Sequence, residues 1–203
     1  MTAVGITVLA SGGLDSTACL AYYMTAGYKV RALWIDYAQA AASAEESAIE
    51  QITAYYSLPL QKILISGIHW PPLGKELFEY RGRNLTLLSL AYNTAPFEPG
   101  LIALGIHQGT DFVDCTEAFV DQVNQLLIFL SDGSSRIDCP FLRWSKLDIA
   151  RYAMTQHVPI DLTYSCEKGL RPPCKECMKC RDIQTMLSDL ETGSVEDENS
   201  QHA

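Results

Sequence analysis

The stretch GITVLASGGLDST at residues 5–17 decides the fold. Its apolar first half predicts a strand, and Gly12 with Gly13 predicts a sharp turn, because residues without a Cβ let the backbone bend and approach a ligand. A helix is predicted to follow, with free N–H groups and its positive dipole end facing whatever occupies the turn. No Gly-Lys-Ser/Thr sequence follows, so the turn is not a Walker-type loop. The stretch therefore predicts a pyrophosphate site of another kind.

Residues 11–16 resemble the Ser-Gly-Gly-x-Asp-Ser loop of the PP-loop ATP pyrophosphatases. The resemblance implies that ATP is split between its α- and β-phosphates and that a substrate becomes an adenylate. It also implies that ATP is bound by the loop and its flanks, namely Ala10, Ser11, Gly12, Gly13, Leu14, Asp15, Ser16 and Thr17. The alternative is an ordinary strand-to-helix turn that Asp15 or Ser16 caps.

Apolar runs and helix-like stretches alternate along the chain. Strands are predicted at residues 5–10, 30–36, 61–65 and 101–106, and helices at residues 16–26, 43–56, 84–94, 115–130 and 145–156. Near-continuous apolar strands are typical of a parallel sheet buried on both faces. The alternation predicts a doubly wound, mostly parallel α/β fold, which binds ligands beyond the carboxyl ends of its strands.

Four of the seven cysteines cluster near the end of the chain in the pattern C-x7-C-x2-C-x2-C. Four thiolates at this spacing can surround a tetrahedral Zn²⁺, and such a closed site is structural. An iron–sulfur cluster or a redox-active pair of cysteines could use the same residues. The predicted zinc ligands are Cys166, Cys174, Cys177 and Cys180.

Composition and charge divide the chain of 203 residues into three regions. We predict a PP-loop α/β nucleotide-binding domain at residues 1–160, a helical zinc-binding region at 161–188 and an acidic disordered tail at 189–203. The tail holds five acidic residues and no Lys or Arg, and the net charge is −9. An acidic chain is poorly suited to bind a nucleic acid directly. Without an apolar stretch of about 18 residues or a basic leader, a cytoplasmic protein with no membrane contact is expected.

Further segments resemble the QueC family, the 7-cyano-7-deazaguanine synthases, within the same superfamily. The resembling segments are Asp36-Tyr37-Ala38-Gln39, Arg81-Gly82-Arg83-Asn84, Gly105-Ile106-His107 with Asp111 and Asp114-Cys115, Pro140-Phe141, Ser145-Lys146-Leu147-Asp148-Ile149 and Thr163-Tyr164-Ser165-Cys166. The resemblance implies that ATP and Mg²⁺ activate 7-carboxy-7-deazaguanine as an acyl adenylate. Ammonia then gives the amide, and a second activation gives the nitrile. It also makes a homodimer plausible.

The chemistry of that first step predicts roles for single residues. Negative charge gathers at the α-phosphate, so N–H donors and cations are needed there. Asp15, Ser16, Arg83 and Lys146 are the predicted catalytic residues, with Asp15 holding or orienting Mg²⁺. The predicted substrate-binding residues are Tyr37, which can stack on a base, Arg83, Asn84, and Asp111 and Asp114, which can accept from a guanine-like N–H edge.

Each of these residues also has an ordinary structural explanation. Arg83 could pair with Glu76 or Glu79 at the surface, and Lys146 could be a solvated helix residue behind the cap Ser145. Tyr37 could pack in the core, and Asp114 could cap the following helix. Cys115 could be a small buried side chain that only fills space.

Departures from the family pattern lie away from the ATP loop. Gln39-Ala40-Ala41 stands where the family has Gln-Arg-His, Ala38 replaces a glycine, Thr116 replaces an arginine, and the 111–114 loop looks about two residues short. These changes predict a diverged homologue. QueC-like proteins also occur in antiphage defence systems, where an amine on a partner protein can accept the activated acyl group. This resemblance implies such an amine as an alternative to ammonia. A tRNA-thiolating enzyme and an inactive nucleotide-binding zinc scaffold are weaker alternatives.

Overall fold

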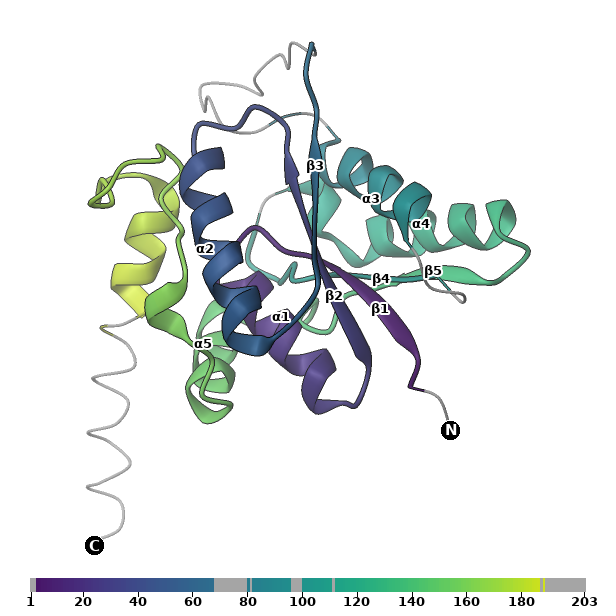
Figure 1. Ribbon diagram of the computed structural model, residues 1–203, viewed down its shortest axis with the longest axis horizontal. Helices are drawn as coiled ribbons and strands as arrows, with labels where there is room; N and C mark the ends of the chain where they lie inside the picture. The colour runs from purple at the N-terminus through teal and green to yellow at the C-terminus, as the bar shows by residue number, and fades with distance from the viewer. Residues whose placement is uncertain are drawn as a thin grey trace, which may run out of the picture.

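A parallel sheet forms the centre of the molecule (Figure 1). The computed structural model describes residues 3–67, 80, 82–95, 100–110, 112–186 and 188. Within them five strands pair in the order β3-β2-β1-β4-β5, and every pair is parallel. The strands are β1 (Gly5–Leu9), β2 (Lys29–Asp36), β3 (Leu60–Leu64), β4 (Gly100–Leu104) and β5 (Ser135–Asp138). The predicted doubly wound sheet is confirmed.

Helices cover both faces of this sheet (Figure 1). One buried cluster joins the sheet to α1 (Leu14–Thr25), α2 (Ala42–Tyr56) and α5 (Lys146–Thr155). A second cluster joins it to α3 (Arg83–Thr94) and α4 (Glu117–Leu130). Two short 3-10 helices, η1 (Val113–Cys115) and η2 (Ile160–Leu162), lie in the connections that the structure describes, and residues 178–186 are helical.

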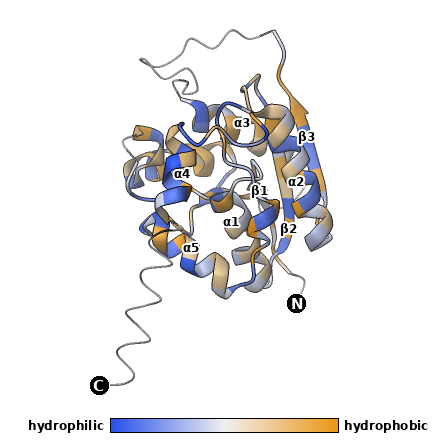
Figure 2. Ribbon diagram, turned by 90° about the vertical axis from the view of Figure 1, so that its left-hand side faces the viewer, coloured by the Kyte–Doolittle hydropathy of each residue, from blue (hydrophilic) through white to orange (hydrophobic). Residues whose placement is uncertain are grey.

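The burial of the central strands explains why their sequences are apolar runs. All five residues of β4 are buried, as are the three middle residues of β1. Parallel strands covered on both faces need apolar side chains in both directions. The edge strand β3 has no fully buried residue and carries both hydrophilic and hydrophobic side chains (Figure 2).

The structure adds one strand that the sequence did not predict, and it rules out two of the capping alternatives. Strand β5 was not predicted, because its four residues alternate buried and exposed positions and include Arg136 and Asp138. The cap of α1 is Gly13, with no side-chain hydrogen bond, so neither Asp15 nor Ser16 caps that helix. The N-cap of α4 is Thr116, whose Oγ1 accepts from the N–H of Phe119, rather than Asp114.

The C-terminal region packs directly on the sheet domain. Cys166, Cys177, Cys180 and Met186 belong to the buried cluster that contains α1 and α2. The N–H of Tyr164 donates to the carbonyl of Gly12 at 2.9 Å, which ties this region to the glycine turn. The predicted tail at 189–203 and Asp111 lie outside the described residues. No helix in the described part of the chain is long and apolar enough to cross a membrane.

Candidate functional site

The turn between β1 and α1 depends on glycine at its first position. Gly12 has a φ of +80°, in the left-handed region that side chains disfavour. A Cβ there would lie 2.9 Å from the Cβ of Ala48 and 3.0 Å from the carbonyl oxygen of Glu45. Helix α2 therefore packs against the bare backbone of the turn, which fixes the turn beside the first residues of α2.

Hydroxyl groups brace this turn from within. Ser16 Oγ and Thr17 Oγ1 donate to the carbonyl of Gly13 at 3.0 and 2.8 Å. Ser11 Oγ accepts from the N–H of Gly13 at 3.4 Å and lies 3.5 Å from Ser16 Oγ. Because Gly13 provides no capping side chain, the first N–H groups of α1 are available to an anion.

Asp15 and Lys146 meet although they are 131 residues apart. Lys146 is the first residue of α5, which Ser145 and Asp148 start through a capping box. Its Nζ donates to Asp15 Oδ2, and both side chains are less than one third exposed. His107 Nε2 lies 3.9 Å from the same carboxylate oxygen. The sequence-predicted residues Asp15, Ser16 and Lys146 thus lie together at the start of α1.

Gly105 lets the end of β4 approach this group of residues. A Cβ on Gly105 would lie 2.7 Å from the carbonyl oxygen of Asp15 and 3.2 Å from the backbone nitrogen of Ser16. Both neighbours are backbone atoms of the first turn of α1, which cannot move without displacing the loop. The close approach requires glycine at this position.

We predict that Gly105→Ala destabilises the protein by about 2 kcal/mol, since overpacking a rigid contact typically costs that much. The melting temperature should fall by roughly 6 °C in a domain of this size. Gly13→Ala is the control, because its Cβ would meet atoms no closer than 3.5 Å. That control is expected to lose less than about 1 kcal/mol, mainly as a poorer N-cap. Equal melting temperatures for the two variants would contradict the packing described.

A cavity of about 170 Å³ opens beside the glycine turn. It lies where β1, β2 and β4 end, as a parallel sheet predicts for its ligand site. Of the sequence-predicted residues, Ala10, Ser11, Tyr37, Arg83 and Asn84 line it. The structure therefore gathers residues from the turn, the end of β2 and the start of α3 around one cavity.

Asn84 and Asp114 are joined to each other. The N–H of Asn84 donates to Asp114 Oδ2 at 3.1 Å, and Asn84 Nδ2 donates to the carbonyl of Asp114 at 2.9 Å. Asp114 thus holds the start of α3 and is absent from the residues that line the cavity. Tyr37 packs edge-to-face on Tyr80, with ring centroids 5.9 Å apart.

Ala38, next to Tyr37, keeps a φ of +66°. This left-handed conformation favours glycine over alanine.

Among the cavity residues that the sequence prediction missed, three carry polar side-chain groups, namely Trp34, Glu45 and Lys179. Glu45 Oε2 accepts from Gln39 Nε2 at 2.8 Å. Burial raises the pKa of Glu45, and the positive charges of Lys179 and Arg83 oppose that rise. Lys179 lies inside the second C-x2-C spacing, between Cys177 and Cys180, and reaches the cavity because the C-terminal region folds back over α2.

The four clustered cysteines form a compact group that can hold a metal ion. Their sulfur atoms all lie within 4.8 Å of one another, and those of Cys174 and Cys180 are 3.9 Å apart. A tetrahedral ion with metal–sulfur bonds of about 2.3 Å sets its ligands roughly 3.8 Å apart. Burial opposes ionisation of Cys166, but N–H donors of Cys174, Leu170 and Lys168 lower its pKa to about 6. Backbone N–H donors also lower the pKa of Cys174, whereas burial raises the pKa of Cys177 and of Cys180.

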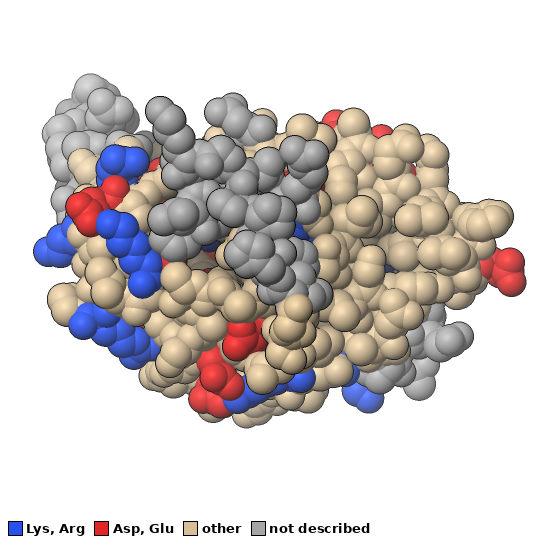
Figure 3. Space-filling view, turned by 90° about the horizontal axis from the view of Figure 1, so that it is seen from above, with Lys and Arg blue, Asp and Glu red and all other residues tan. Residues whose placement is uncertain are grey.

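Positive side chains surround the cysteine group. Lys and Arg side chains gather at the end of the molecule that the C-terminal region occupies (Figure 3). Exposed basic residues of this region are Lys168, Arg171, Lys175, Lys179 and Arg181. Their charge offsets the negative charge that four thiolates would bring to a divalent ion.

Comparisons with known proteins agree with this geometry. The chain matches the model of the family described as "Queuosine biosynthesis protein QueC" over residues 5–70 and 80–189. A 7-cyano-7-deazaguanine synthase of Persephonella marina is 30% identical, over 87% of this chain and 88% of that protein. One from Aquifex aeolicus is 31% identical, over 92% of this chain and 97% of that protein.

A solved structure shares the fold at low sequence identity. It is the predicted subunit of a tRNA methyltransferase from Methanocaldococcus jannaschii, with a TM-score of 0.52 and 12% identity over 74% of each chain. At that identity the likeness concerns the fold alone. The family match covers both the glycine turn and all four clustered cysteines. The chain therefore belongs to the QueC family of PP-loop proteins.

Proposed function

We propose that this protein uses ATP to adenylate the carboxylate of 7-carboxy-7-deazaguanine, releasing pyrophosphate, and converts the product with ammonia to 7-cyano-7-deazaguanine. The observation that carries the proposal is the uncapped glycine turn, set between the Asp15–Lys146 pair and a cavity lined by Arg83. Anion donors, cations and a space for a ring system thus meet at one edge of the sheet. The family match supports the substrate class.

The turn is suited to hold the leaving pyrophosphate. N–H groups at the start of α1 and the hydroxyls of Ser11 and Ser16 supply donors, and the helix dipole favours negative charge there. Lys146 and Arg83 supply the cations that a carboxylate needs when it attacks a phosphate. In this step a carboxylate oxygen bonds to the α-phosphorus while the bond from that phosphorus to the bridging oxygen breaks.

Asp15 fits the role of a Mg²⁺ ligand. Its Oδ2 is engaged by Lys146, but Oδ1 is buried and accepts no hydrogen bond from the described residues. Mg²⁺ prefers carboxylate oxygens and commonly takes one or two of them beside substrate phosphates. When bound, the ion would neutralise charge on the phosphates. Lys146 would keep Asp15 turned toward that position.

For the cysteine group we propose a structural zinc ion. Sulfur atoms less than 4.8 Å apart suit a single tetrahedral ion better than a cluster that must fit several irons between them. The ion would hold the C-terminal region against the glycine turn through the Tyr164–Gly12 hydrogen bond.

The acceptor of the acyl group defines a second candidate function. Ala40 and Ala41 replace a cation and an imidazole of the family pattern, and the loop that carries Gly169 packs directly on the backbone of Ala40. These changes support transfer to an amine of a partner protein, as in QueC-like antiphage enzymes, ending at the amide. An inactive scaffold is disfavoured, because the turn and the Asp15–Lys146 pair are complete.

One incubation distinguishes these possibilities. The protein is mixed with ATP, Mg²⁺ and 7-carboxy-7-deazaguanine, with and without ammonium, and the nucleotide and base products are identified by mass. We expect AMP with the amide and nitrile when ammonium is present. AMP without nitrile would favour a protein acceptor. No AMP, either with or without ammonium, would refute adenylation.

A further inference from the structure

Glu45 is placed to contact whatever occupies the cavity. It lies in the first turn of α2, the helix that packs against Gly12, and it is the one carboxylate among the described residues that line the cavity. The cavity is slightly larger than the ~150 Å³ that accommodates benzene in an engineered protein core. A flat ring system entering it would therefore approach the Glu45 carboxylate.

The hydrogen bonds of Gln39 hold Glu45 in place. Gln39 Nε2 donates to Glu45 Oε2 at 2.8 Å and to the carbonyl of Ile35 at 3.2 Å, while its Oε1 accepts from the N–H of Tyr37 at 2.9 Å. An ionised carboxylate can accept about four hydrogen bonds, and Gln39 accounts for one. Acceptor capacity therefore remains for a ligand. Burial raises the pKa of Glu45, while the hydrogen bond from Gln39 and the positive charges of Lys179 and Arg83 oppose that rise and favour the ionised form that accepts.

Trp34 adds a donor beside this acceptor. Its side chain lines the cavity and is only 2% exposed. Its Nε1–H meets no ordinary hydrogen-bond geometry among the described residues, but it faces Glu45 closely enough that a weak hydrogen bond between the two lowers the pKa of that carboxyl. A buried N–H without a partner is unfavourable unless a ligand accepts from it.

We propose that Glu45 and Trp34 read the hydrogen-bonding edge of a 2-aminopyrimidinone ring, which makes them specificity-determining residues for the deazaguanine base. The inference rests on the proposed function. Glu45 accepts from the ring N–H and the exocyclic amino group, and Trp34 donates to the neighbouring ring carbonyl. A carboxylate facing two adjacent donors is a strong and directional arrangement. Asp114, which holds the start of α3, is not needed for this role.

Calorimetric binding to Glu45→Gln tests the assignment. The ligands are 7-carboxy-7-deazaguanine, its analogue without the 2-amino group, and α,β-methylene-ATP. The amide of glutamine presents a donor to a donor edge, so Kd for the acid should rise about 10- to 100-fold. Kd for the ATP analogue should change less than about twofold, since the variant leaves the glycine turn intact. The wild type should bind the 2-desamino analogue about 10- to 100-fold more weakly than the acid, and the variant should lose this preference.

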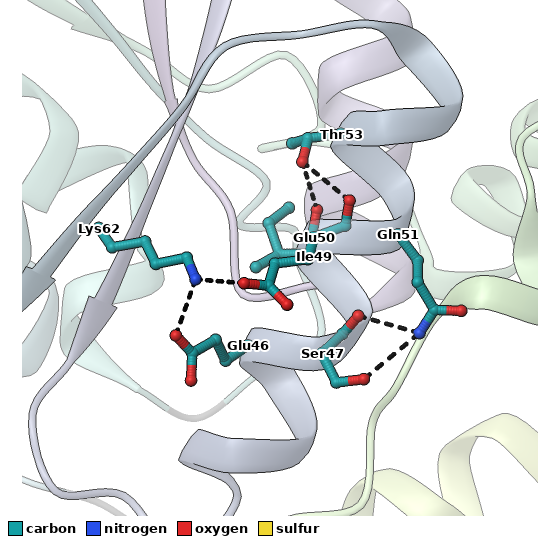
Figure 4. A network of polar contacts seen from close by, with 7 residues as sticks. All are labelled: Glu46, Ser47, Ile49, Glu50, Gln51, Thr53 and Lys62. Carbon is teal, nitrogen blue, oxygen red and sulfur yellow. Dashed lines mark hydrogen bonds and ion pairs between the residues drawn. The ribbon is translucent and has the colours of Figure 1, made fainter.

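Glu46→Gln is the matched control. Glu46 is the next residue of α2, but it faces outward and pairs with Lys62 on β3 at 2.9 Å (Figure 4). It should bind all three ligands as the wild type does. The thermal melting temperature of each variant checks that the fold is retained.

Three results would overturn the assignment. The first is equal binding of the acid and its 2-desamino analogue by the wild type. The second is a Glu45→Gln defect confined to the ATP analogue, which would place adenine at this edge. The third is no binding of the acid at all. Discrimination by the 2-amino group without AMP formation would support the recognition and refute the proposed function. AMP formation together with unchanged binding of the acid to Glu45→Gln would support the proposed function and refute recognition by Glu45.

Discussion

Replacing Lys146 with alanine is expected to lower the rate of acid-dependent AMP formation by about 10²- to 10³-fold, the usual cost of losing one preorganised electrostatic contact in a reacting centre. Lys146 Nζ donates to Asp15 Oδ2 at the start of α1, so the variant removes a cation and frees the carboxylate it orients. The loss should appear in kcat more than in the KM for ATP, because the N–H donors of the turn remain. Initial rates of AMP release give both constants.

Lys62→Ala is the control for loss of a lysine. Lys62 pairs with Glu46 and Glu50 of α2 (Figure 4) and is not among the residues that line the cavity. Its rate should stay within about twofold of the wild type, since exposed ion pairs contribute little. A Lys146→Ala enzyme as active as Lys62→Ala would show that the Asp15–Lys146 pair is only structural.

Loss of one zinc ligand should have the largest effect on stability. Cys174→Ser is expected to release the metal and to lower the free energy of unfolding by ~3 kcal/mol or more, because metal binding energy is folding energy in such sites. The melting temperature should then fall by roughly 10 °C. AMP formation should decline as well, since Tyr164 of this region donates to Gly12 in the turn.

Cys139→Ser is the matched control, because Cys139 is half-buried at the end of β5 and lies outside the metal-capable group. It should keep one zinc per chain when metal content is measured by atomic emission. Full zinc content in Cys174→Ser would refute the ligand assignment. Iron in place of zinc in the wild type would refute the choice of metal.

The fold could be predicted where physical signals are local. The apolar runs of β1, β2 and β4 reflect burial on both faces, and Gly12 marks the turn because a side chain at that position would clash with α2. Strand β5 escaped prediction because Ile137 is its one buried apolar residue, so its four residues resemble a loop. Pairing with β4, rather than composition, makes this segment a strand.

The site could be predicted only in part, for the same reason. The turn is formed by the consecutive residues 11–16, so its chemistry can be predicted from that stretch alone. The cavity is lined by residues from the end of β2, the start of α2, the start of α3 and the C-terminal region. Glu45 stands in an alanine-rich helix with other acidic residues nearby, so nothing local separates it from a solvated charge. Lys179 stands between two of the clustered cysteines, so its place in the sequence does not indicate contact with the cavity. Packing of α2 and of the C-terminal region on the turn brings these residues to the cavity.

Transfer of a labelled oxygen tests the central claim most directly. 7-Carboxy-7-deazaguanine carrying ¹⁸O in its carboxyl group is incubated with the protein, ATP, Mg²⁺ and ammonium, and the nucleotide product is analysed by mass spectrometry. If the carboxylate attacks the α-phosphate, the oxygen that bridges carbon and phosphorus leaves with AMP when ammonia attacks the carbonyl carbon. The account predicts AMP that carries ¹⁸O. Unlabelled AMP, or ADP in its place, would contradict it.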